Sequence, residues 1–331
     1  MRILGIETTC DETAAAVVED GRILSNVVSS QIRLHRRFHG VVPELAARAH
    51  LQRVSAVVEA ALDGCRASID AVAFARGPGL MGPLLVGKMA ALAAAEVLGC
   101  PIVAVNHLEG HIFAAELAEK LRFPLVTLIV SGGHTDLIFC RAPGRYRLLG
   151  RTRDDAAGEA YDKVARMLAL GYPGGPVIDR RARDGNPAAV DFSRPLLPGS
   201  WDFSFAGIKT AMLYHLRDIK RAPSRREVSD LCASFQEAVV ETLVRKTLAA
   251  ARHCRVRDVV VGGGVAANGR LREVFEAEAK RLGVRVIIPA PILCTDNGAM
   301  LAQAASHRLR RGRPGRSLRC DPGLGFESWG A

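Results

Sequence analysis

Two histidines four residues apart carry the most specific chemistry in this chain. His107 and His111 lie in the run NHLEGHIFAAEL. On a helix, side chains four apart project from one face about 5–6 Å apart, so both imidazoles can reach one metal ion. Asp296, in the run CTDNGAMLAQAA, follows a strand-like segment and precedes a helix-like one, and can supply a third ligand. Two histidines and a carboxylate form an open site for a divalent ion, although histidines at this spacing also occur as ordinary core or surface residues.

The same run is close to the HExxH motif of zinc peptidases but places its acid elsewhere. In that motif the general-base glutamate directly follows the first histidine, whereas here Glu109 lies two residues after His107. Two residues turn about 200° along a helix, so Glu109 is expected to point away from the face that carries the histidines. Peptidase chemistry then lacks its base.

Length and composition define the class of protein. The 331 residues suggest about two domains, and 49% hydrophobic with 24% charged residues is ordinary for a globular chain. The N-terminal run MRILGIETTC lacks the features of a signal peptide, and no stretch approaches the ~18 apolar residues of a membrane span. Eight cysteines without a CxxC pair predict reduced thiols, with neither a disulfide framework nor a thiolate zinc site. We expect a cytoplasmic protein with no membrane partner.

The charge balance favours a polyanionic partner. The net charge is +11, with arginine clusters from Arg33 to Arg37 and from Arg308 to Arg319. Such clusters attract phosphate backbones when they share one face of the molecule. Arginine-rich segments are also often simply solvated, so charge alone leaves nucleic-acid binding open.

The elements that must position these residues follow an α/β pattern. Residues 2–7 and 14–19 predict a hairpin with a polar tip that contains Thr8, Thr9, Asp11 and Thr13. A similar hairpin is predicted at 125–139, so the chain suggests two related halves. Further strands are predicted at 71–75, 101–105, 258–261 and 284–288, and helices at 82–98, 155–169, 227–252 and 269–282.

Three glycine-bearing turns compete for a phosphate, since backbone N–H groups without side chains can surround an anion. Gly82 to Lys88 fits the P-loop spacing, but Met89 replaces the magnesium-binding Ser or Thr, so a helix entry is predicted. The run GGGVAAN at 262–268 fits GxGxxA, but no acid follows the next strand to hold a ribose, which argues against a dinucleotide and leaves a mononucleotide open. The third candidate is the turn that contains Gly132 and Gly133.

Ten motifs, in order, resemble the bacterial tRNA threonylcarbamoyladenosine transferase family, within the superfamily of actin, sugar kinases and heat-shock ATPases. The resemblance extends to about residue 305. The motifs are GIETTCDET, GVVPELAARAH, GPGLMGPLLVG, NHLEGHIF, VSGGHTDL, DDAAGEAYDKVARMLALGYPGGP, FSFAGIKTA, SFQEAVVETL, VVGGGVAANGRLR and CTDNGAMLA.

This resemblance implies two related actin-like (ribonuclease H-like) domains with a nucleotide cleft between them. The expected N-terminal domain spans 1–122 and is completed by a helix around 296–310; the C-terminal domain spans 123–295, and a basic tail spans 311–331. The implied reaction moves a threonylcarbamoyl group from threonylcarbamoyl-AMP to the exocyclic amine of the adenosine 3′ of the anticodon, position 37, in tRNAs that read ANN codons, with release of AMP. Implied partners are tRNA, a paralogous actin-like subunit and a P-loop ATPase.

The resemblance also assigns residues. It places one divalent metal ion on His107, His111 and Asp296, with iron(II) favoured and zinc(II) as the alternative. No covalent nucleophile is required, since the donor is already an activated anhydride. The implied substrate-binding residues are Val130, Ser131, Gly132, Gly133, His134, Asp162, Gly175, Asp179 and Asn268.

Other functions remain as alternatives. A kinase or ATPase of the same superfamily comes second, a metalloprotease third, and a scaffold without activity is conceivable. The chain also departs from the family pattern at Phe38-His39-Gly40, where a Tyr-Gly-Gly-like turn is more usual, and at Ala206, where Ser is common.

Overall fold

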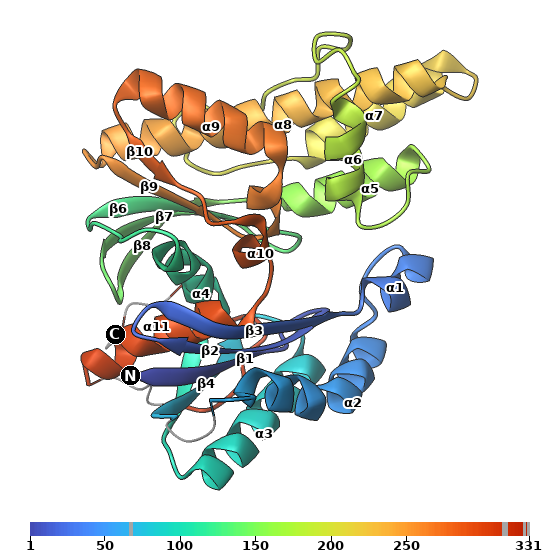
Figure 1. The fold of residues 1–331 in the computed structure, drawn as a ribbon. Helices are drawn as coiled ribbons and strands as arrows, with labels where there is room; N and C mark the ends of the chain where they lie inside the picture. Colours follow the sequence, from blue (N-terminus) through green and yellow to red (C-terminus); the bar gives the residue numbers. More distant parts are fainter. Residues whose placement is uncertain (66–68, 313–316, 327–328, 330–331) are drawn as a thin grey trace. The chain divides into compact units, whose positions relative to one another are not determined.

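The fold divides into two compact units, each built around one sheet (Figure 1). A computed structural model describes residues 1–65, 69–312, 317–326 and 329. Unit 1 comprises Met1–Leu121, Ala142–Tyr146 and Pro289–Ala331, and unit 2 comprises Arg122–Arg141 and Arg147–Ile288. Part of the predicted basic tail, residues 313–316, 327–328 and 330–331, lies outside the described residues.

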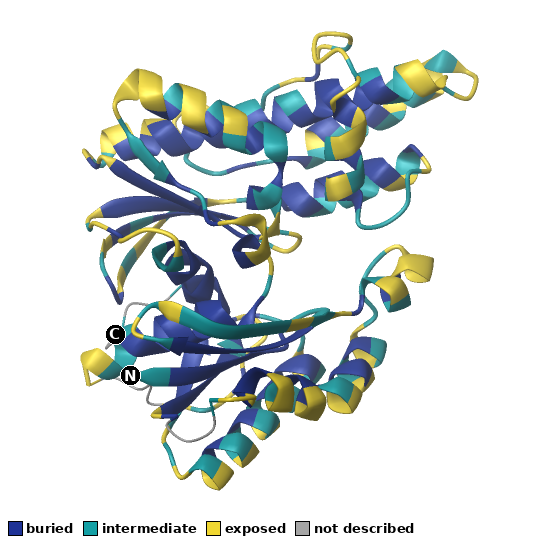
Figure 2. Cartoon of the chain, in the orientation of Figure 1, coloured by how far each residue is buried: buried dark blue, intermediate teal, exposed yellow. Residues whose placement is uncertain are grey.

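The sheet of unit 1 has the order β3-β2-β1-β4-β5. β2 is antiparallel to both β1 and β3, whereas β4 is parallel to β1 and β5. The central strands are buried, as the dark strands of Figure 2 show. The strands are β1 (Arg2–Glu7), β2 (Glu12–Glu19), β3 (Arg22–Ser30), β4 (Ala71–Gly77) and β5 (Ile102–Asn106).

Helices cover both faces of this sheet. α2 (Pro43–Leu62) and α3 (Met81–Leu98) pack on one face, where their apolar side chains meet Leu4, Ile6 and Phe74. α4 (His107–Ala114) and α11 (Gly298–Arg310) lie on the other face. A Cβ on Gly5 would stand 2.1 Å from the carbonyl oxygen of Gly298, so only glycine allows α11 to approach the sheet this closely. The shorter helices are α1 (Ile32–His35), η1 (Arg36–Phe38), η3 (Ala115–Leu117) and α10 (Pro291–Cys294).

Unit 2 repeats the same sheet. Its order, β10-β9-β6-β7-β8, is that of unit 1 read from the other edge, with β6 antiparallel to β7 and parallel to β9. The predicted duplication is therefore confirmed at the level of topology. The elements are β6 (Leu125–Val130), β7 (Thr135–Ala142), β8 (Arg145–Arg151), α5 (Ala157–Met167), α6 (Gly174–Ala182), α7 (Ala206–Ile219), α8 (Arg225–His253), β9 (Asp258–Gly262), η4 (Gly264–Ala267), α9 (Gly269–Leu282) and β10 (Arg285–Ile287).

The strands and helices predicted from periodicity are present, and several elements were missed. β3 reads RILSNVVSS and is only half-buried, so its alternation is weak; α2, α6 and α7 also had no predicted counterpart. One expectation was wrong: α3, with a mean hydropathy of 1.5 over 18 residues, is long and apolar enough to cross a membrane by length and composition alone. Many residues of this helix are alanine or glycine, so the sequence did not stand out as one long apolar run. The helix packs on β4 and α2.

Candidate metal centre

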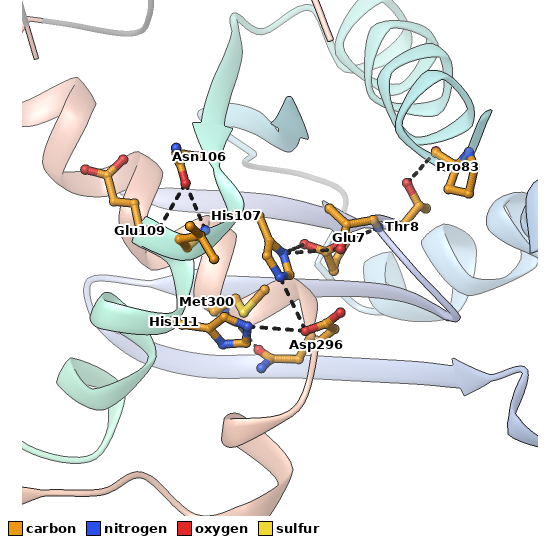
Figure 3. A network of polar contacts seen from close by, with 12 residues as sticks. Glu7, Thr8, Pro83, Asn106, His107, Glu109, His111, Asp296 and Met300 are labelled. Carbon is orange, nitrogen blue, oxygen red and sulfur yellow. Dashed lines mark hydrogen bonds and ion pairs between the residues drawn. The ribbon is translucent and has the colours of Figure 1, made fainter. Parts of the chain in front are cut away.

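The two histidines lie on the first two turns of α4, directly after β5 (Figure 3). Asn106 ends the strand and caps the helix, because its Oδ1 accepts hydrogen bonds from the backbone N–H groups of Leu108 (2.9 Å) and Glu109 (3.4 Å). His107 therefore occupies the first helical position, and His111 follows one turn later on the same face.

Asp296 reaches these histidines from the other end of the chain. It lies between α10 and α11, where Asn297 caps α11 by accepting a hydrogen bond from Met300 N at 3.0 Å. Its Oδ1 is 3.6 Å from Nε2 of His107 and 3.3 Å from Nε2 of His111. One ligand atom from each of the three residues lies within 4.8 Å of the others, so they can surround a single ion.

A metal ion fits an otherwise unexplained feature of His111. The side chain is 1% exposed, and neither ring nitrogen has a hydrogen-bond partner among the described residues. The contact of Nε2 with Asp296 at 3.3 Å does not have hydrogen-bond geometry, so both buried nitrogens lack a hydrogen bond at a cost in free energy that coordination of Nε2 would reduce. The donor set of two imidazoles and one carboxylate suits a divalent transition metal.

Glu7 supports the centre and was not recognised in the sequence as a site residue. Its carboxylate is fully buried at the end of β1, and its Oε2 lies 3.0 Å from Nδ1 of His107. Burial alone lowers the pKa of His107, but the neighbouring carboxylates of Asp296 and Glu7 outweigh it and raise that pKa to about 9. A carboxylate on Nδ1 fixes the ring so that Nε2 faces the ligand cluster. The only signal in the sequence is an acid at the end of an otherwise apolar first strand.

Glu109 points away from the histidines, as predicted (Figure 3). It is fully buried, accepts a hydrogen bond from the hydroxyl of Tyr146 at 2.5 Å, and pairs with the guanidinium of Arg308 at 2.7 Å. A carboxylate held in this way anchors α4 to α11 and is not free to act as a peptidase base.

The polar tip between β1 and β2 completes this side of the centre. We call residues 7–12 the acidic tip. Thr8 donates a hydrogen bond to the carbonyl of Pro83 at 2.9 Å (Figure 3), and a Cβ on Gly87 would stand 2.2 Å from Thr8 Oγ1. The glycines of the run GPGLMGPLLVGK therefore let α3 pack closely on the acidic tip. This confirms the predicted helix entry and leaves the run no role as a P-loop.

A second set of predicted residues gathers in unit 2 around the turn between β6 and β7. We call residues 130–134 the glycine turn. Ser131 N donates to the carbonyl of His134 at 2.8 Å, while Gly132 and Gly133 are exposed, and a Cβ added to either would meet no atom within 4 Å. The N-terminus of α5 packs against this turn through Gly158, whose N–H donates to the carbonyl of Ser131 at 3.1 Å. Backbone amides of the glycine turn thus border open space, a geometry that suits an anion.

The remaining predicted residues adjoin this turn through neighbouring elements. A Cβ on Gly263 would stand 2.4 Å from the carbonyl oxygen of Val130. The loop after β9 therefore packs directly against the glycine turn. Asn268 caps α9, because its Oδ1 accepts a hydrogen bond from Leu271 N at 2.9 Å. Gly269, next in the chain, lies beside the carboxylate of Asp179 on α6.

Asp162 already has a structural role. Its Oδ1 accepts a hydrogen bond at 2.6 Å from the N–H of Gly174, the first residue of α6, and the neighbouring Gly175 faces open space. All nine predicted substrate-binding residues therefore belong to unit 2, and the three predicted metal ligands to unit 1.

Fold and site together define a class of protein. The repeated five-stranded sheet with an antiparallel second strand is an actin-like fold, here with two histidines and one carboxylate in unit 1 that could hold a metal ion. Residues 22–303 match the model of the family described as TsaD, tRNA N6-adenosine threonylcarbamoyltransferase. The chain belongs to this family, and it is therefore a transferase that modifies tRNA.

Curated relatives carry the same name. The one from Anaeromyxobacter dehalogenans strain 2CP-C is 54% identical and aligns over 97% of this chain and 98% of its own length. The relative from Geobacillus thermodenitrificans is 51% identical over 97% of this chain and 96% of its own length.

Solved structures of lower identity share the fold alone. Full-length HypF, in its phosphate- and nucleotide-bound form, has a TM-score of 0.62 at 13% identity, covering 97% of this chain and 56% of HypF. Component A of the Acidaminococcus fermentans (R)-2-hydroxyglutaryl-CoA dehydratase has a TM-score of 0.52 at 15% identity, covering 94% of this chain and 99% of that one.

Proposed function

We propose that this chain transfers the threonylcarbamoyl group of threonylcarbamoyl-AMP to the exocyclic amine of the adenosine 3′ of the anticodon, in tRNAs that read ANN codons. The amine forms a new C–N bond to the carbamoyl carbon, the bond from that carbon to the phosphate oxygen breaks, and AMP leaves while the amine loses a proton. The donor is an activated anhydride, so the protein need only position it and stabilise developing charge. The observation that carries the proposal is the convergence of His107, His111 and Asp296 in a chain of this family.

The glycine turn is proposed to hold the adenylate end of the donor. Its exposed glycines leave the backbone amides of residues 132 and 133 accessible to a phosphate. Asp179 can accept hydrogen bonds from ribose hydroxyls, since its side chain is 16% exposed and its contact with Arg183 is long, at 3.5 Å. Asp162, Gly175 and Asn268 shape the same surface at the N-terminal ends of α6 and α9.

His107, His111 and Asp296 would hold one divalent ion, with iron(II) proposed and zinc(II) as the alternative. When bound, this ion supplies a Lewis acid that can orient the threonyl end of the donor or polarise its carbonyl. Glu7 holds the proton of His107 at Nδ1 and leaves Nε2 for the metal. Thr9 strengthens this arrangement, because its N–H donates to Glu7 at 2.5 Å.

Partner proteins are part of the proposal. Exposed apolar side chains follow α3 and the adjoining α2, an arrangement typical of a protein interface. We propose that a paralogous actin-like subunit covers this face, and that a P-loop ATPase completes a cytoplasmic modification complex. The side chains are Leu51 (69% exposed), Met81 (46%), Leu85 (46%), Met89 (61%) and Val97 (85%).

One reaction tests the proposed function. Purified chain, with the candidate partners, is mixed with threonylcarbamoyl-AMP and unmodified tRNA, and the nucleosides are analysed by mass spectrometry. The native chain should form threonylcarbamoyladenosine, and His111→Ala should form almost none and lose its metal. Tight binding of tRNA and donor without product would indicate a scaffold and overturn the proposal.

A further inference from the structure

A short basic loop beside the acidic tip has no role in the chemistry described so far. We call residues 31–42 the basic loop; it contains α1 and η1 and joins β3 to α2 (Figure 1). From residue 31 to residue 43 the sequence holds no acidic residue. Arg33, Arg36 and Arg37 are exposed on it, and Figure 2 shows the exposed surface along α1.

The charge of these three arginines is not compensated by the described residues. In the part of the chain that the structure describes, none of them has a carboxylate within ion-pair distance. Other arginines of the protein are neutralised locally: Arg153 lies 2.8 Å from Asp202 and Arg270 lies 2.8 Å from Glu237. Three uncompensated guanidinium groups within five residues form a concentrated positive surface, which attracts a polyanion.

An aromatic side chain stands among these charges. Phe38 is 45% exposed, and the guanidinium of Arg37 lies over its ring at 4.7 Å. An exposed apolar ring is unfavourable in water, but it offers a stacking surface for a nucleobase. Arginines for phosphates with an exposed ring for a base are the combination by which proteins bind unpaired RNA.

The basic loop is held firmly at its base, so it can present these groups in a defined arrangement. Gln31 is fully buried and its N–H donates to the carbonyl of Asp11 at 2.9 Å. His35 is also fully buried; it contacts the side chain of Gln31 at 3.2 Å and accepts a hydrogen bond from Val42 N at 3.3 Å. The two ends of the basic loop are thereby joined and only its tip is exposed.

The same contacts join the basic loop to one end of the acidic tip, and the other end of the tip contacts His107. Gln31 is bonded to Asp11, and Ser30 donates to Glu12 at 3.3 Å, while Glu7 at the start of the acidic tip contacts His107. The arginines next to the acidic tip attract phosphates. An RNA bound here would keep its backbone on the basic loop, next to the acidic tip.

We propose that the basic loop is a docking surface for single-stranded RNA of the substrate tRNA, in which Arg33, Arg36 and Arg37 contact phosphates and Phe38 stacks on a base. This inference rests on the proposed function and names a surface for its RNA substrate.

The test compares two matched charge deletions in the full-length chain. The first is Arg33→Ala, Arg36→Ala and Arg37→Ala together; the second removes three exposed arginines of unit 2, with Arg217→Ala, Arg252→Ala and Arg257→Ala. The dissociation constant for unmodified tRNA is measured by fluorescence anisotropy over a series of salt concentrations. Thermal unfolding verifies that both variants fold.

Deletion in the basic loop should weaken tRNA binding roughly 10- to 100-fold and reduce the slope of log K against log salt by roughly 2 to 3. The control should change the constant less than about threefold by the same principle. Phe38→Ala should weaken binding about fivefold or more with an unchanged slope. In the transferase assay the KM for tRNA should rise, while kcat and the KM for threonylcarbamoyl-AMP stay constant.

Equal effects of the two triple variants would show that net charge alone matters, and would overturn the inference. So would unchanged tRNA binding with a loss of activity only when the partner proteins are present, because the basic loop would then bind a protein. If the native chain binds tRNA through the basic loop but forms no product, the proposed reaction fails and the docking surface stands.

Discussion

The acidic tip and the glycine turn occupy the same position in the two sheets and have opposite chemistry. Each joins the central strand to its antiparallel neighbour, and each turn between the strands is four residues long, 8–11 in unit 1 and 131–134 in unit 2. In the acidic tip, Glu7, Thr8 and Thr9 are at most 2% exposed and bond to neighbouring elements. In the glycine turn, Gly132 and Gly133 are exposed, and no side chain covers their backbone groups.

The difference shows how a duplicated fold can provide two kinds of site. Glu7 of the acidic tip points into the unit and contacts His107, a proposed metal ligand, so we expect this tip to act through that carboxylate. The glycine turn instead exposes backbone amide groups, which suit an anion, and we expect it to act through them. Topology fixes where a loop lies, and a few residue types decide which charge it accepts.

The variant with the largest expected effect tests whether the proposed metal site and the glycine turn act independently. Asp296→Asn removes the anionic ligand, so the chain should lose its metal and its product formation should fall about 10³-fold, equivalent to several kcal/mol of lost charge stabilisation. Binding of AMP, measured by calorimetry, should change less than about threefold, because the glycine turn belongs to unit 2. A large loss of AMP affinity would contradict the division of roles.

Glu7→Gln tests the acidic tip alone. Losing the negative charge on Nδ1 of His107 should weaken metal binding about 10- to 100-fold in a chelator competition, as for other supporting carboxylates. Glu12→Gln is the matched control. Burial, with Asp11 and Asp296 nearby, raises the pKa of Glu12 to about 10, so this acid is protonated at neutral pH and glutamine should replace it with little change. A greater effect at Glu12 than at Glu7 would show that Glu7 is not the supporting carboxylate.

Gly158→Ala tests whether packing of α5 holds the glycine turn in place. Its new Cβ would stand 2.6 Å from the carbonyl oxygen of Ser131 and 2.8 Å from Gly132 N, so the turn must move. We expect about 1–3 kcal/mol of destabilisation in urea unfolding and weaker AMP binding, with metal content unchanged. Gly132→Ala faces open space and should change stability by less than about 0.5 kcal/mol. Equal destabilisation by the two variants would show that the turn is not held by α5.

The smallest expected effect concerns the segment that leads into α5. Asp155 lies 2.7 Å from Lys163 and 2.7 Å from Lys209. Burial raises the pKa of this carboxyl, but the two lysines outweigh it and lower the pKa below its ordinary value. A lowered folded-state pKa stabilises the protein above the unfolded-state pKa of about 3.9, and this stability disappears as the pH falls through the folded value.

Asp155→Asn should therefore lower the free energy of unfolding by about 1 kcal/mol at pH 7, and the difference from the native chain should shrink below about pH 4. Urea unfolding at several pH values measures this. Asp191→Asn, which breaks an ion pair whose acid is 99% exposed, is the control and should have almost no effect. A difference for Asp155→Asn that is independent of pH would exclude the ion pairs as its cause.

The sequence by itself determined the strands with strong alternation or long apolar runs, the duplication and the family. These signals are local: β6 is one continuous apolar run, and the spacing of His107 and His111 follows from the helical period alone. The direction of Glu109 was predictable for the same reason, because two residues along a helix always face different sides.

Only the tertiary structure decided which distant residues meet. Glu7 and Asp296 are separated from His107 by 100 and 189 positions, and no periodicity links them; they converge because α11 packs across β1 and β5 in unit 1. The same holds for the glycine runs, where close packing of α3 on the acidic tip uses residues that resemble a phosphate loop. The sequence gives the charge of each side chain and its spacing along the chain. A site also requires short distances between side chains that are far apart in sequence, and these arise only when the folded sheet brings its strand ends together.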